Sequence, residues 1–67
     1  MENRTIFEEW KNEGEMYVGL KSVFWAQRMS LMVREVLDST SLLDFSTKIS
    51  LLNFCKENYD IEKMKEE

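Results

Sequence analysis

The chain offers one cysteine and several carboxylates as side chains that could carry covalent or acid–base chemistry. It contains no histidine, which removes Ser–His and Cys–His nucleophile pairs and most general bases that titrate near neutral pH. Cys55 follows Leu52 and Phe54 late in a helical pattern, and apolar surroundings keep a thiol protonated and unreactive. We therefore interpret Cys55 as a core residue.

Two pairs of carboxylates have a spacing that would bring them together on a helix. Glu9 and Glu13 are one helical turn apart, and Glu57 and Asp60 are three residues apart. Two carboxyl groups serve as catalytic acid and catalytic base only when burial drives their pKa values apart. Both pairs lie in polar stretches, where such burial is not expected. We expect solvated surface charges here and no catalytic site.

Metal and cofactor sites are equally poorly supported by the sequence. Zinc sites use several Cys or His ligands, but the chain has one cysteine and no histidine. Asp60, Glu62 and Glu66 lack the spacing of a calcium-binding loop, and no glycine-rich phosphate-binding loop is present. We expect a non-enzymatic protein without a metal or cofactor.

The elements that position these residues are predicted to be helices. The 67 residues include no proline and two glycines, so the strongest helix breakers are rare. Thr5 and Glu8 match a capping box, and Gly14 is suited to end a helix. This predicts a first helix near residues 6–13.

Two further helices are predicted, near residues 15–37 and 41–59. The second begins at residue 15 or 20, because residues 16–18 also suit a short extended segment. Polar residues 38–41 mark the break that follows it. Ser41 is expected to cap the third helix, with Asp44 in its first turn, and residues 61–67 are expected to fray. The prediction is a single all-α domain over residues 1–67, a small bundle of about three helices.

The central helix is apolar on two faces. One face has the spacing of a coiled-coil seam, and two cations, Lys21 and Arg28, lie at its edge. Together they form our candidate partner or dimer interface: Val18, Lys21, Trp25, Arg28, Met29, Met32 and Val36. The other comprises Met16, Leu20, Val23, Phe24 and Leu31. A chain of this size buries only about 60% of its unfolded surface, so we expect dimerisation or a partner chain to complete the bundle. The alternative, that the stripe is ordinary core, stays open.

Charge suggests a second surface. The net charge is −4, and acids outnumber cations in residues 1–15 and 57–67 but not in residues 16–37. A possible acidic surface for a basic partner comprises Glu8, Glu9, Glu13, Glu57, Asp60 and Glu62. The longest apolar run, residues 23–26, is too short to span a membrane.

The expected function is that of a protein–protein interaction module, an adaptor, regulator or inhibitor that acts through the central helix as a homodimer or with a second protein. The acidic start lacks the features of a signal peptide, and a lone thiol fits the reducing cytoplasm. The alternative is a small dimeric DNA-binding transcriptional regulator. Direct contact with nucleic acid is disfavoured, because Lys21 and Arg28 align but Glu35 continues their seam.

Overall fold

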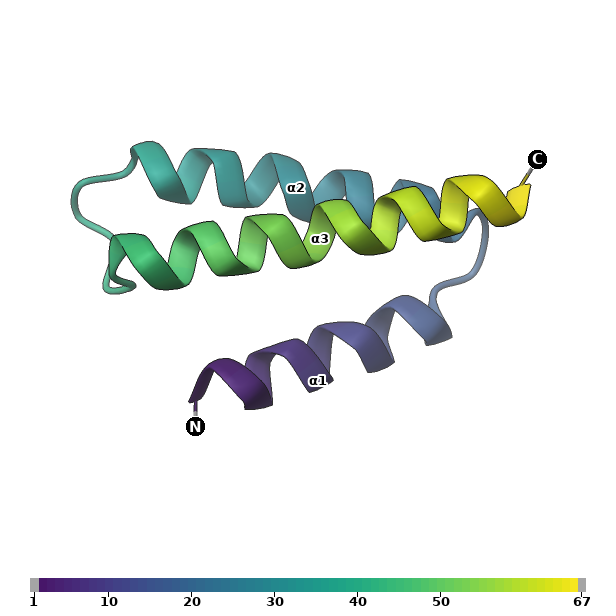
Figure 1. Ribbon diagram of the computed structural model, residues 1–67, viewed down its shortest axis with the longest axis horizontal. Coiled ribbons are helices and arrows are strands. Elements are labelled where there is room, and N and C mark those ends of the chain that lie inside the picture. The colour runs from purple at the N-terminus through teal and green to yellow at the C-terminus, as the bar shows by residue number, and fades with distance from the viewer. Residues whose placement is uncertain (1, 67) are drawn as a thin grey trace.

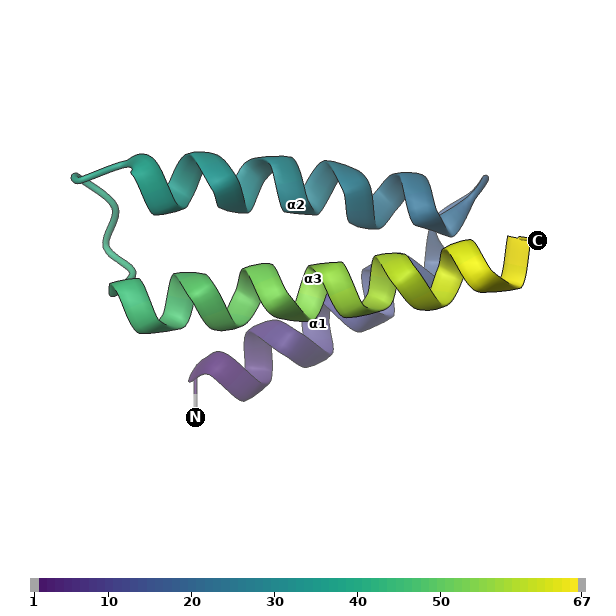
Figure 2. The ribbon, with the colours of Figure 1, turned by 45° about the horizontal axis from the view of Figure 1, so that its top comes forward.

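The computed structural model describes residues 2–66 as three α-helices (Figure 1): α1 (Glu2–Met16), α2 (Lys21–Leu37) and α3 (Phe45–Glu66). The all-helical prediction is confirmed, since these residues contain no strand. Helices α2 and α3 form an antiparallel hairpin, and α1 crosses one side of it in both ribbon views (Figures 1 and 2). Within residues 2–66 no helix combines the length and apolar character needed to cross a bilayer.

The first helix is longer at both ends than the predicted 6–13. Thr5 lies inside α1, so it does not mark the start of the helix, and the helix continues through Gly14. Gly14 does not take the left-handed conformation of a helix end. Among the described glycines only Gly19 does, with φ 119°, in the turn before α2. The chain therefore turns five residues later than the sequence indicated.

α2 ends at Leu37, the predicted position, and its start lies next to the later of the two predicted starts, residues 15 and 20, whereas the bounds of α3 differ from the predicted ones. α2 starts at Lys21, and residues 17–20 form a turn in place of a helical or extended start. α3 starts at Phe45 rather than 41, because Asp44 is its cap: the Asp44 carboxylate accepts the Thr47 backbone N–H at 3.0 Å. The predicted cap, Ser41, lies in the loop, where its hydroxyl donates to Glu35 at 2.5 Å.

A seam between α2 and α3 holds most of the core. The seam residues of α2 are Ser22, Trp25, Met29, Met32 and Val36, and those of α3 are Lys48, Leu51, Cys55 and Asn58. Both series alternate steps of three and four, the spacing of helices packed in a shallow coiled coil. Trp25, Leu51 and Cys55 are at most 2% exposed. The coiled-coil seam found in the sequence is thus filled within the chain, by α3.

Helix α1 packs on a flank of this hairpin through a close approach at Gly14. A Cβ atom at Gly14 would lie 2.9 Å from Trp25 Cζ2 and 3.2 Å from Phe24 Cε2. The Phe7 and Phe54 rings are 4.7 Å apart, and Lys11 donates to Asn58 at 2.8 Å. Gly14 is therefore a packing residue, which lets α1 approach the two aromatic side chains of α2.

Charged side chains from neighbouring segments satisfy the helix ends. Lys21 Nζ donates to the carbonyl oxygens of Gly14, Glu15 and Tyr17, at 3.3, 2.7 and 3.2 Å, at the end of α1. The Glu66 carboxylate accepts the Ser22 backbone N–H and hydroxyl at the start of α2, at 3.3 and 3.0 Å. This contact holds the last turn of α3 against α2. α3 is therefore helical through residues 61–66, for which the sequence predicts fraying.

Candidate functional site

The apolar members of the candidate interface lie mainly in the seam of the hairpin. Trp25 and Met32 are each 2% exposed, and Met29 is half-buried and packed against them. Val36 is half-buried one turn further along α2. Val18 is separate from this group, 93% exposed in the turn before α2. Trp25 and Met32 are therefore core residues of the chain itself, which is the alternative that the sequence left open.

The two cations of the candidate interface are engaged within the chain. Lys21 holds the last carbonyl groups of α1. The Arg28 guanidinium lies 4.9 Å from the ring centres of both Trp10 and Phe24 and forms an ion pair with Glu13. Cation–π contacts and an ion pair together hold Arg28 between α1 and α2. Neither cation is presented as a free charge on an exposed face.

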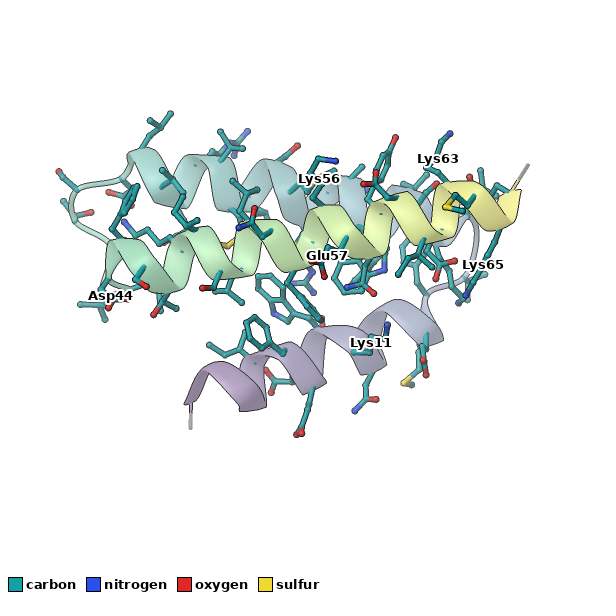
Figure 3. The ribbon with its side chains drawn as sticks, viewed as in Figure 1. Lys11, Asp44, Lys56, Glu57, Lys63 and Lys65 are labelled. Atoms are coloured by element: carbon teal, nitrogen blue, oxygen red, sulfur yellow. The ribbon has the colours of Figure 1, made fainter. Side chains whose placement is uncertain are left out.

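The six acidic residues come from two helices, and three of them are paired with cations of the same chain. Glu13 pairs with Arg28, Asp60 with Lys56 at 3.0 Å and Glu62 with Lys65 at 3.6 Å. Glu8 and Glu9 are exposed on α1. Glu57 is exposed on α3 and is labelled in Figure 3. Three of the six carboxylates are thus partly neutralised by neighbouring cations.

A groove lies between α1, the second half of α2 and the loop that joins α2 to α3. Its volume is about 710 Å³, within the range of ligand-binding clefts. Its apolar lining comprises Ile6, Trp10, Leu31, Met32, Leu42, Leu43 and Leu51. Its polar members are Glu9, Arg34, Glu35, Thr40 and Ser41. Apolar surface dominates the groove and charges lie among its lining residues.

Two leucines of the groove are open to solvent. Leu31 is 50% exposed and Leu42 is fully exposed. The sequence placed Leu31 on the second apolar face of the central helix, whereas Leu42 falls within the predicted third helix, residues 41–59. Because Leu42 lies in the loop, no helical periodicity could have predicted its place beside Leu31.

Cys55 has the chemistry of a core residue. Its side chain is fully buried, and burial raises the pKa of the thiol to about 11. A thiol with such a pKa is protonated at neutral pH and is a poor nucleophile and metal ligand. Among the side chains that the structure describes, those of residues 6–66, no group of three or more Cys, Asp or Glu is placed to hold a metal ion.

Comparison with protein-family models, curated proteins and solved structures gave no match for this chain.

Proposed function

We propose that this protein is a non-enzymatic protein–protein interaction module that binds another protein in the groove beside α2. The observation that carries the proposal is Leu31, which is half exposed in an apolar groove even though the chain has already filled its own core. Soluble monomers rarely keep contiguous apolar surface exposed unless it binds something. Bound there, the module acts as an adaptor, regulator or inhibitor of its partner, and its lone thiol suits the reducing cytoplasm.

The partner that fits the groove is an amphipathic helix of another protein. Apolar side chains at helical spacing would fill the space beside Trp10, Leu31 and Leu42. The exposed charges of the groove, Glu9 and Arg34, favour a basic and an acidic residue at the edges of the bound helix. A DNA-binding role is less well supported, because Lys21 and Arg28 are occupied within the chain.

Site-specific photocrosslinking tests the proposal. A photoreactive side chain replaces Leu42 in the groove or, as the control, Asn53, an exposed residue of α3 outside the groove. We expect a discrete adduct with a different protein from position 42 only, and we expect Leu31→Glu to abolish it while the circular dichroism spectrum is unchanged.

The partner identified in this way is then purified, and its affinity is measured by calorimetry for the natural chain and for Leu31→Glu. A charge in the apolar groove should weaken binding by at least 100-fold. Equal adducts from positions 42 and 53, or an adduct that persists in Leu31→Glu, would contradict the groove as the binding site.

A further inference from the structure

Arg28 does not line the groove, but it contacts a side chain that does. Its guanidinium carbon lies 4.9 Å from the ring centre of Trp10, and Trp10 lines the groove together with Leu31. Arg28 precedes Leu31 by three residues on α2, so the two side chains are neighbours one turn apart on the helix surface. The Trp10 ring of α1 is thus in contact with both the groove and Arg28.

Arg28 is itself held by a well-packed part of the core. Its guanidinium carbon is also 4.9 Å from the ring centre of Phe24, a side chain that is 7% exposed. Phe24 in turn has ring contacts with Tyr17 at 5.6 Å and with Trp25 at 5.0 Å. A guanidinium is planar and stacks on aromatic faces, which restricts its orientation as well as its distance. Arg28 therefore couples the position of Trp10 to that of a fixed ring of α2.

The contact with Arg28 is the directional contact of the Trp10 ring. Trp10 is half-buried and packs against the core, but the four close ring pairs among the described residues do not include it. Apolar burial is non-directional, whereas a cation–π contact requires the face of the ring. The ion pair between Arg28 and Glu13 adds little, because the Glu13 side chain is 47% exposed. The aromatic contacts of Arg28 therefore determine how Trp10 is oriented.

We propose that Arg28 is a positioning residue of the groove, which holds Trp10 in the orientation that binds the partner helix. This role rests on the proposed function, and Arg28 acts through Trp10 without contacting the partner. A side chain that is ordered before binding does not lose rotamer entropy when the partner arrives. Without Arg28, Trp10 would be in the binding orientation for only a fraction of the time, and the apparent affinity would fall by that fraction.

Arg28→Lys tests this proposal, because it keeps the positive charge and removes the planar stacking. Lys21→Met is the matched control, because it weakens the attachment of α1 at its C-terminal end and Lys21 does not line the groove. Fluorescence quenching by acrylamide, a neutral molecule, reports on Trp10, since the other tryptophan, Trp25, is 2% exposed. We expect quenching to increase in Arg28→Lys and not in Lys21→Met, with an unchanged circular dichroism spectrum in both.

Calorimetry with the protein captured from position 42 gives the second readout. Its affinity should be about fivefold lower for Arg28→Lys and unchanged for Lys21→Met. Unchanged quenching in Arg28→Lys overturns the proposal, and so does an equal loss of affinity in both variants, because that loss would reflect a general loosening of α1. If no discrete adduct forms at position 42, the proposed function fails and the binding role of Arg28 fails with it, whereas quenching still shows whether Arg28 orients Trp10.

Discussion

Replacing Gly14 by Ala should destabilise this protein, although Ala favours a helix. In the interior of a helix the exchange contributes about 1 kcal/mol of stability through backbone entropy. Here the new Cβ atom would lie 2.9 Å from Trp25 Cζ2, whereas carbon atoms in contact prefer about 3.5–4.0 Å. Trp25 cannot withdraw easily, because it is 2% exposed and has ring contacts with Phe24 and Phe54 at 5.0 and 5.6 Å.

The expected balance is a net loss. Overpacking of a core costs about 1–3 kcal/mol, so after the gain in helix propensity the free energy of unfolding should fall by about 1 kcal/mol. For a chain of this length that corresponds to a melting temperature about 4–8 °C lower. Urea unfolding followed by tryptophan fluorescence, at one fixed protein concentration, measures the change.

Asn12→Ala is the matched control, because Asn12 is exposed on the same helix and the exchange should stabilise the chain by a few tenths of a kcal/mol. In a Trp25→Phe background the smaller ring relieves the contact with Trp25, and Gly14→Ala should then stabilise the chain by up to about 1 kcal/mol. If Gly14→Ala by itself raised the urea midpoint as Asn12→Ala does, the close approach of α1 to Trp25 would be refuted.

Three further predictions concern Cys55, Arg28 and Lys21. With its pKa raised to about 11, the Cys55 thiol keeps its proton in the folded chain while the unfolded chain loses it above pH 9. Stability should therefore fall between pH 9 and 11, by about 1.4 kcal/mol per unit more steeply than in Cys55→Ala, as urea titrations would show. Arg28→Lys loses the planar stacking on two rings and should cost about 1 kcal/mol in the same assay. Lys21→Met removes the donor to three carbonyl groups and should cost about 1–2 kcal/mol, with faster amide exchange in the last turn of α1.

The helical class could be predicted because local chemistry determines it: the chain lacks proline and its apolar residues recur at helical spacing. The boundaries depended on contacts between distant residues. Glycine is typical of a helix end, but Gly14 lies inside α1, where it packs closely against Trp25. The last residues have the composition of a fraying tail, but the Glu66 carboxylate accepts two hydrogen bonds from Ser22. Neither contact has a signature in the local sequence.

The sequence predicted an apolar helix face that packs against another helix, but not which helix covers it. The three-and-four spacing of Trp25, Met29 and Met32 specifies a helix packed alongside, whether that helix belongs to the same chain or to another. The seven-residue connection 38–44 lets α3 fold back along α2, so the intramolecular partner is available at no cost in association entropy. The acidic residues were likewise identified by type. Asp60 with Lys56 and Glu62 with Lys65 are pairs four and three residues apart on one helix, whereas the pairing of Glu13 with Arg28 joins two helices and depends on the fold.

The apolar character of α2 on nearly every side is nevertheless not explained by the chain's own packing. α3 covers one arc through the seam and α1 covers the flank of Phe24, and these are the two other helices that the chain has within residues 2–66. Leu31 and Val33 remain 50% and 47% exposed on opposite sides of α2. One additional partner helix cannot contact both positions, because they are separated by about 160° around the helix axis. A helix bound in the groove beside Leu31 would therefore leave Val33 exposed on the other side of α2.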